Sequence, residues 1–417
     1  MQRIRWIGLI LLLIAALVGG IYAGIHFTTP EKNGENSDPP GKQNNGEPPA
    51  PDIRTATLLS VGTTYPHQPQ LQQAHLGGGK YDFSPSFEII APLIREADLA
   101  IATLETAQAG AANGGYTSYP LFNSPIELSE AFKEAGIDIF NTANNHIMDR
   151  GYNGLMDTLD SVRALGIKTF GTAKSWEERE RPFIVEVNGI KLGLISYTYN
   201  INGVTVPAGH EYAINHIENF HTIEPIKADI EKTRSAGADL IALYLHMGEE
   251  YLHEPTPRQK EIVRELTAAG ADMIIGTHSH VPQPLEWIRV ELPDGSVRRS
   301  LVIYTLGNFC TNQHLTTGVP TDLTRYGLLT RIKLGKDMNS AECWIEDVDY
   351  EVYICHIDWR HRVIPVSFIL EAAPEKYHHS EARVKTIRSQ HQSVLEIVEK
   401  YGFSAEKNDF LPLKNSN

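Results

Sequence analysis

Residues with metal-binding side chains follow several short apolar runs in this sequence. Glu105, Asn145, His246, His278 and His280 each stand at or just beyond a run that reads as a strand. In α/β folds, the loops beyond the carboxyl ends of strands gather the side chains of a site. Imidazole suits Zn and Fe, whereas carboxylate and amide oxygens suit harder ions such as Mn. The pattern predicts a divalent-metal site in which a bridging carboxylate holds two ions and water is activated for attack on phosphorus.

The same residues also have ordinary structural explanations. Glu105 is compatible with a helix cap or a solvated acid, and Asn145 with a simple turn, because asparagine tolerates the left-handed backbone region. The spacing of His278 and His280 after a buried run favours a site instead, and His67 is evenly balanced. Six other histidines are interpreted as surface or core positions: His75, His210, His216, His253, His314 and His361.

The elements that must position these residues alternate along the chain, which predicts an α/β domain with a sheet covered by helices. The expected strands are 57–61, 99–104, 137–141, 191–197, 240–246, 273–275 and 301–306. The expected helices are 87–96, 125–135, 154–164, 223–235 and 257–269.

Capping residues mark the ends of several expected helices. Ser124-Pro125 and Thr256-Pro257 each place a capping side chain before a proline, which predicts a helix start. Glycines that predict helix ends stand at Gly136, Gly166, Gly237 and Gly270. Residues 341–370 are predicted to be rich in strands, and residues 380–401 to form one charged helix. The main domain is therefore expected over residues 55–336, with a C-terminal extension over residues 337–417.

The N-terminus indicates the compartment. Arg3 and Arg5 precede an apolar run, Trp6–Phe27, that is long enough to span a bilayer as a helix. Positive charge on its N-terminal side favours a cytoplasmic N-terminus and an extracellular main domain. A cleaved signal peptide is the alternative, but its apolar region is usually shorter. We expect a single-pass membrane anchor over residues 1–27 and a flexible linker rich in Pro, Gly and Asn over residues 28–54.

Composition excludes several classes of protein. The chain of 417 residues has a formal net charge of −14, which argues against nucleic-acid binding. It also argues against broad electrostatic capture of a polyanion, so such a polymer requires a local site or a metal. The three cysteines are too few for a disulfide scaffold. We expect core thiols, with a bridge between Cys343 and Cys355 as the alternative.

Three motifs carry a more specific resemblance. They are ANNHIMDRGYNGLMDTL at 143–159, LHMGEEYLHEPTPRQKEIVRELTAAGADMIIGTHSHVPQPLE at 245–286 and YTLGNF at 304–309. Their order and spacing over residues 57–310 resemble the bacterial capsule-synthesis (CapA-type) family, a poly-γ-glutamate branch of the calcineurin-like metallophosphoesterases. The resemblance implies a four-layer αββα sandwich, two sheets packed together and flanked by helices.

The resemblance also implies roles for individual residues. Asn145, His246 and His278 would ligate one metal with Glu105 bridging, and His280 would serve the other metal. His146 would protonate a leaving group or steady phosphoryl oxygens, with Asp149 orienting it. Glu250 would hydrogen-bond a ligating imidazole, and Asn308 would shape the site from the side.

Two departures from the family pattern bear on activity. Thr63 stands where the family has a metal-binding aspartate, and Thr103 where it has asparagine before Leu-Glu. One metal position is therefore expected to be impaired, with His67 partly compensating. Three functions follow as hypotheses: an accessory component of poly-γ-glutamate synthesis or export that acts with membrane-bound synthase subunits, an active envelope phosphoesterase, or a non-catalytic scaffold that binds polymer or partner.

Overall fold

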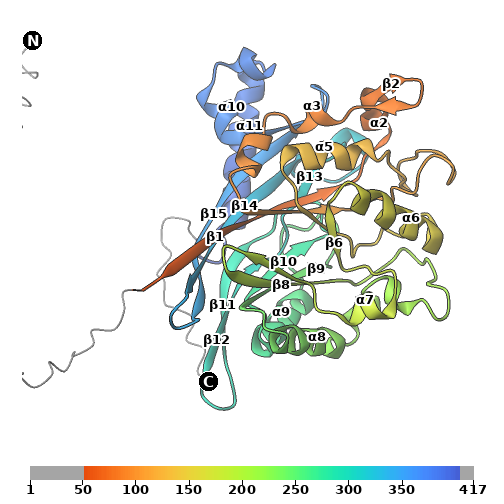
Figure 1. Cartoon of the computed structure of the whole chain (residues 1–417). Helices are drawn as coiled ribbons and strands as arrows, with labels where there is room; N and C mark the ends of the chain where they lie inside the picture. Colours follow the sequence, from red (N-terminus) through yellow and green to blue (C-terminus); the bar gives the residue numbers. More distant parts are fainter. Residues whose placement is uncertain (1–50, 404–417) are drawn as a thin grey trace, which may run out of the picture. The chain divides into compact units, whose positions relative to one another are not determined.

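A computed structural model describes residues 51–403 of the chain (Figure 1). The expected transmembrane segment Trp6–Phe27 and most of the expected linker lie outside these residues. Among the helices between residues 51 and 403, none combines the length and the apolar composition that a bilayer crossing requires.

Two large sheets form from the described residues, and the first has eight strands. In pairing order they are β16 (Arg362–Pro365), β15 (Cys343–His356), β14 (Tyr326–Asp337), β1 (Ile53–Thr64), β4 (Leu99–Leu104), β5 (Ile139–Asn141) and β6 (Lys168–Phe170), with β13 (Asn308–Cys310) beside the end of β1. β1, β4, β5, β6 and β13 are parallel, whereas β14, β15 and β16 pair antiparallel. The C-terminal strands therefore complete the sheet that begins with β1.

The second sheet has six strands among the described residues. In pairing order they are β11 (Leu285–Glu291), β12 (Val297–Ile303), β10 (Met273–Thr277), β9 (Leu240–His246), β8 (Ile190–Thr198) and β7 (Ile184–Val187). The four inner strands are parallel, and β7 and β11 pair antiparallel at the edges. A separate short ribbon joins β2 (His75–Gly77) and β3 (Lys80–Tyr81).

The two sheets pack face to face around one apolar core. Leu58 and Ile101 of the first sheet meet Leu194 and Tyr244 of the second in this core. The buried hydroxyls of Ser60 and Tyr244 cross the interface at 2.6 Å. The inner faces of both sheets are thus excluded from water, and burial of apolar area is the main force that holds them together.

Helices cover the outer faces of both sheets (Figure 1). The first sheet is covered by α3 (Ser84–Phe87), α4 (Ala91–Ile94) and α5 (Glu127–Ala135), and the second by α8 (Glu224–Ser235) and α9 (Pro257–Ala269). The remaining α-helices between residues 51 and 403 are α2 (Gln68–Ala74), α6 (Gly151–Ala164), α7 (Trp176–Glu180), α10 (Val366–Glu371) and α11 (Glu381–Val398). The mixed α/β class predicted from the sequence is confirmed.

Local signals placed both ends of α9 correctly but misplaced two other helix starts. The Thr256 hydroxyl accepts a hydrogen bond from the Gln259 amide, and Gly270 ends the helix in the left-handed region. The predicted helix over 87–96 is wrong, because the chain forms α3 and α4 with prolines in their first turns. The predicted cap at Ser124 is also wrong, since α5 begins at Glu127.

The C-terminal part also differs from expectation in one respect. The segment from Val366 onward, expected to be strand, forms the short helix α10, because Pro365 ends β16 and fixes the entry to the helix. The three cysteines are free and buried, as expected for core thiols, and Cys343 and Cys355 are not bridged.

Candidate metal centre

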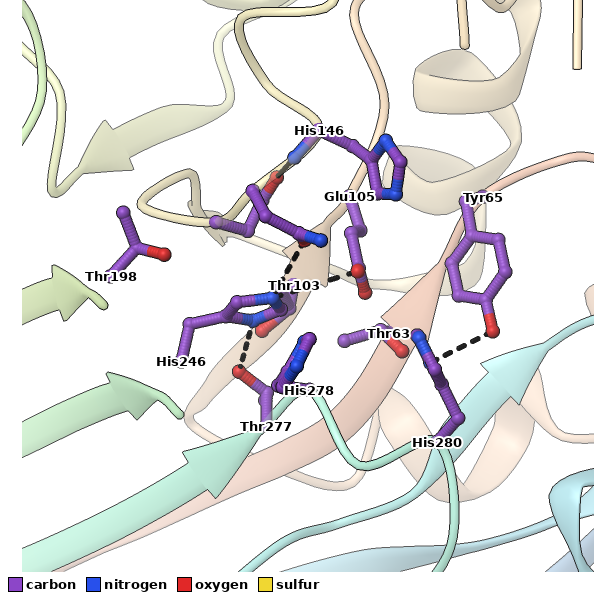
Figure 2. A network of polar contacts seen from close by, with 12 residues as sticks. Thr63, Tyr65, Thr103, Glu105, His146, Thr198, His246, Thr277, His278 and His280 are labelled. Carbon is purple, nitrogen blue, oxygen red and sulfur yellow. Dashed lines mark hydrogen bonds and ion pairs between the residues drawn. The ribbon is translucent and has the colours of Figure 1, made fainter. Parts of the chain in front are cut away.

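The carboxyl ends of strands from both sheets meet at one place (Figure 2). Glu105 directly follows β4, His246 is the last residue of β9, and His278 directly follows β10. Parallel strands end at the same edge of a sheet, so these side chains point toward one another although they are far apart in the sequence. The gathering that the strand-end rule predicts is therefore present.

Three buried side chains form a group that can hold a metal ion. Glu105, His278 and His280 each offer one ligand atom, and these atoms lie within 4.8 Å of one another. Both Glu105 carboxylate oxygens and His278 Nδ1 are buried and have no hydrogen-bond partner among the described residues. A buried carboxylate with two unpaired oxygens is costly unless a cation compensates its charge. The donor set therefore fits a divalent cation, and we call these three residues the metal group.

Burial sets the charge state of the metal group. It raises the pKa of Glu105 well above its usual value, and the nearby charge of Glu250 adds to this. Burial lowers the pKa of His278 far below its usual value and that of His280 to about 3. The imidazoles are thus neutral at physiological pH, the form that ligates metals. A bound cation would favour the ionised form of Glu105.

Two tyrosines that were not predicted from the sequence each lie beside one ring nitrogen of His278 or His280 and leave the other nitrogen available to a metal ion. The Tyr199 hydroxyl lies 2.8 Å from His278 Nε2, which leaves Nδ1. On His280, Nδ1 lies 2.8 Å from the Tyr65 hydroxyl and 3.0 Å from Asn308 Oδ1, which leaves Nε2. Such partners fix the tautomer and orientation of a ligating imidazole. Both tyrosines directly follow strand ends, so the strand-end rule already contained the signal.

Asn308 connects the strands around the metal group. Its side-chain oxygen accepts a hydrogen bond from the Thr63 hydroxyl at 3.1 Å and another from the Tyr65 hydroxyl at 2.8 Å. Its amide nitrogen donates to the carbonyl oxygen of Thr324 at 2.9 Å. Asn308 is fully buried, so it shapes the site through this network, and Thr63 directs its hydroxyl into the same network.

Asn145 and His246 lie beside the metal group and bond each other. His246 Nε2 is 2.9 Å from Asn145 Oδ1 and 3.6 Å from a carboxylate oxygen of Glu105. His246 Nδ1 lies 2.9 Å from the Thr277 hydroxyl. Burial lowers the pKa of His246 well below its usual value. The atoms that Asn145 and His246 would offer to an ion therefore face each other next to Glu105.

His146 and Asp149 form a second unit at the same edge. His146 Nδ1 lies 2.8 Å from Asp149 Oδ2, and that oxygen also accepts a hydrogen bond from the Phe122 amide at 2.7 Å. Phe122 packs edge-on against the His146 ring, with centroids 4.8 Å apart. Asp149 thus holds the imidazole in one orientation, as the sequence interpretation expected of it.

Two other expected site residues are not part of the metal group. His67 packs against Tyr65, with ring centroids 5.2 Å apart, and burial lowers its pKa to about 4. Glu250 lies 3.9 Å from His280 Nε2, which is too long for a hydrogen bond, and 43% of its side chain is exposed. The expected hydrogen bond from an imidazole to Glu250 is therefore absent between these described residues.

The backbone at the site is held in an uncommon conformation. His278 has φ of 100° and His280 has φ of 60°, in the region that favours glycine. Each such residue costs about 1–3 kcal/mol and persists only where its surroundings impose it. Here the backbone at the end of β10 packs closely against that of Tyr304, which holds the turn in place. A Cβ added at Gly276 would lie 1.8 Å from the carbonyl oxygen of Tyr304.

Comparisons with known proteins agree with the sequence motifs. Residues 57–313 match the family described as bacterial capsule synthesis protein PGA_cap. The capsule biosynthesis protein CapA of Bacillus anthracis is 27% identical over 48% of this chain and 47% of its own length. The PGA biosynthesis protein CapA of Bacillus subtilis is 27% identical over 58% of this chain and 60% of its own length. The chain thus spans about half to three fifths of the length of these curated relatives.

A solved phosphatase from Mycoplasma pneumoniae aligns with a TM-score of 0.40 and 14% identity over 72% of this chain and 94% of its own. The family match is stronger evidence of kinship than this structural alignment. It spans more than half of the chain and contains the whole metal group, His146 and Asp149. The chain belongs to the bacterial capsule synthesis protein PGA_cap family.

Proposed function

We propose that this protein is a membrane-anchored, extracytoplasmic accessory component of poly-γ-glutamate capsule synthesis or export. The family match over residues 57–313 carries this proposal, together with the names of its CapA relatives. The apolar run Trp6–Phe27 with Arg3 and Arg5 before it supports the anchor and its orientation. The partners would be the membrane, the anionic polymer and the membrane-bound synthase or export subunits.

Deletion of the gene in a polymer-producing strain tests this function. We expect surface polymer to fall and to return with the wild-type gene. A version without residues 1–27, exported by an unrelated cleaved signal, would separate the need for the anchor from the need for the domain. Unchanged surface polymer after deletion would refute the accessory role.

The second candidate function is a metal-dependent hydrolase of phosphoesters on the calcineurin-like metallophosphoesterase fold. The observation that favours it is the His146–Asp149 pair beside the metal group, at the edge where both sheets end. Glu105, His278 and His280 would hold the ion, which would supply positive charge to stabilise negative charge on the phosphoryl oxygens. Mn, Zn and Fe are the ions that this mixture of nitrogen and oxygen donors suits.

The chain's own residues have distinct parts in such a reaction. His146 would donate a proton from Nε2 to a leaving oxygen, because Asp149 holds the other nitrogen. Thr63 brings no charge to the site and hydrogen-bonds to Asn308. We therefore expect weaker retention of a second ion than a carboxylate at this position would give.

Metal analysis of the purified protein, followed by a panel of phosphoesters, distinguishes a catalyst from a binding scaffold. A catalyst should retain metal, and His146→Ala should lose most turnover while it keeps the metal. His278→Ala should lose both. Retained metal with no turnover on any ester would favour the scaffold. Turnover that is unchanged in both variants would place the reaction elsewhere.

A further inference from the structure

A second hollow lies apart from the metal group. It has a volume of about 410 Å³ and is lined by residues of α6, β6, α7, β8 and α8 and of neighbouring loops. No residue of the metal group is among its described lining residues. Pockets of about 300–1,000 Å³ are typical of ligand sites. The hollow is therefore large enough to bind a ligand of its own.

Positive charge predominates in this hollow. Its lining contains five cationic side chains and two acidic ones, Glu178 and Asp229. The cationic residues are Arg163, Lys168, Arg179, Arg181 and Lys232. Because the whole chain has a formal charge of −14, this local surplus is opposite in sign to the rest of the protein. A concave surface with one sign of charge raises the local concentration of ligands with the other sign.

The acidic residues of the hollow are already paired. Glu178 lies 2.6 Å from Arg163, and Asp229 lies 3.0 Å from Arg179 and 3.1 Å from Lys232. The Tyr197 hydroxyl also donates to Asp229 at 2.7 Å. These contacts neutralise the two carboxylates and hold the three cations in place. A ligand therefore meets oriented N–H donors, which lowers the entropic cost of binding.

Two cations at this hollow have no such partner. Lys168 on β6 and Arg181 after α7 are exposed, and neither lies within ion-pair distance of a carboxylate among the described residues, although the charge of Lys168 acts on the carboxyl group of Asp138. Exposed cations without a partner contact an incoming anion without first breaking a pair. These two residues are the best positioned to be the first contacts for a ligand.

Apolar side chains form the other part of the lining. Phe170 and Phe183 stack with ring centroids 5.9 Å apart, and Leu194 lines the same hollow. Free phosphate or sulfate would gain nothing from these surfaces. A ligand whose carboxylates are separated by short aliphatic stretches of main chain would use both kinds of surface, since its methylene groups would cover apolar area.

We propose that this hollow binds a short segment of a linear polyacid whose carboxylates are separated by short aliphatic stretches of its main chain. The inference rests on the proposed function, because it assigns a place on the protein to the anionic polymer of that function. The polymer is held by Lys168, Arg181 and the paired arginines, at a distance from the metal group. The hollow then accounts for polyanion binding by a chain that is acidic as a whole.

Binding of a fluorescein-labelled γ-linked glutamate oligomer to the full chain in detergent tests this site. The double variant Lys168→Glu/Arg181→Glu should weaken binding about tenfold or more, since two attractions become repulsions. The control Lys385→Glu/Arg388→Glu makes the same change of net charge on exposed positions of α11 and should change binding less than about twofold. The neutral variant Lys168→Gln/Arg181→Gln should be intermediate.

The outcomes separate this inference from the proposed function. Equal loss in both charge-reversed variants would show a response to net charge alone and would overturn the site. Loss of binding in His278→Ala but not in Lys168→Glu/Arg181→Glu would place the polymer at the metal group and would also overturn it. Equally tight binding of a γ-linked oligomer whose α-carboxylates are converted to amides would reject carboxylate recognition. The accessory role is tested independently by gene deletion, so either proposal can fail while the other stands.

Discussion

The substitution Glu105→Gln removes the negative charge of the metal group with little change in side-chain shape. Both oxygens of Glu105 are buried without hydrogen-bond partners among the described residues. In the metal-free protein we therefore expect this carboxyl group to destabilise the fold, and its replacement by a neutral amide to stabilise it. With metal present the order should reverse, because only the wild type has the carboxylate that compensates the cation. The substitution should thus have opposite signs under the two conditions.

The magnitudes follow from general values. An unsatisfied buried polar group costs about 1–3 kcal/mol, and a ligand at a hundred times its Kd stabilises by about 2.7 kcal/mol. For a folded part of this size, 1 kcal/mol corresponds to roughly 1–2 °C in Tm. Glu105→Gln should therefore raise Tm by about 1–5 °C with chelator. Saturating metal should raise the wild type by about 3–5 °C and the variant much less.

The dependence on pH gives a second check on the same residue. The pKa of Glu105 is raised in the folded, metal-free state above its usual 4.5, so the folded state binds more protons than the unfolded one. Stability from this group is therefore present below about pH 4.5 and is lost as pH rises through the folded pKa. The advantage of Glu105→Gln in chelator should be larger at pH 8 than at pH 5.

Thermal melts with EDTA, Mn²⁺ or Zn²⁺ at both pH values measure these shifts. Glu186→Gln on β7 removes a charge from an exposed position and is the matched control. Equal metal-induced shifts in Glu105→Gln and the wild type would refute the reasoning. So would a lower Tm of Glu105→Gln than of the wild type in chelator.

Three further substitutions test other parts of the fold. Asn308→Ala should cost about 2–4 kcal/mol, because several buried partners lose their bonds, and should reduce retained metal; urea unfolding and elemental analysis measure the two effects. Gly276→Ala should cost about 3 kcal/mol or more, since its Cβ would lie 1.8 Å from the Tyr304 carbonyl oxygen, and an unchanged urea midpoint would contradict this packing. The ring of His356 stacks on that of His379 with centroids 4.3 Å apart, and burial lowers the pKa of His356 to about 4. The free energy of unfolding should therefore fall as pH drops from 6.5 to 4. His356→Phe should flatten this fall in urea midpoints, and an identical fall in the variant would reject the role of His356.

Much of the inner sheet structure was predictable from the sequence. The expected strands at 99–104 and 240–246 have the observed bounds of β4 and β9, and the expected helix at 257–269 those of α9. The two strands are continuous apolar runs and the helix begins with a capping box. Each of these features can be recognised from neighbouring residues in the sequence alone. Pro92, in the first turn of α4, shows the limit, because a proline favours a helix start as readily as it interrupts a longer helix.

The site was predictable in its ligand types but less so in its contacts. Glu105, His278 and His280 each follow a strand, and this position predicted that they would meet at the carboxyl ends of the strands. Tyr65 and Tyr199 also follow strand ends, but which imidazole each one contacts depends on how the two sheets face each other, and no local pattern records that. The cationic hollow likewise joins β6 of one sheet to β8 of the other. Four of its cations lie within residues 163–181, but only the fold brings Lys232 of α8 beside them.

The antiparallel pairing of β14 with β1 bears on how this domain can be divided or transplanted. Residues from Ile53 to Ser60 pair with residues from Thr330 to Asp337, and β15 pairs onward from β14. A fragment cut at residue 313, where the family match ends, would leave one side of the longest parallel strand without its neighbour and expose part of the inter-sheet core. Such edges invite pairing with other chains. Recombination between relatives should therefore retain the C-terminal strands together with the matched segment, because the two share one sheet and one apolar core.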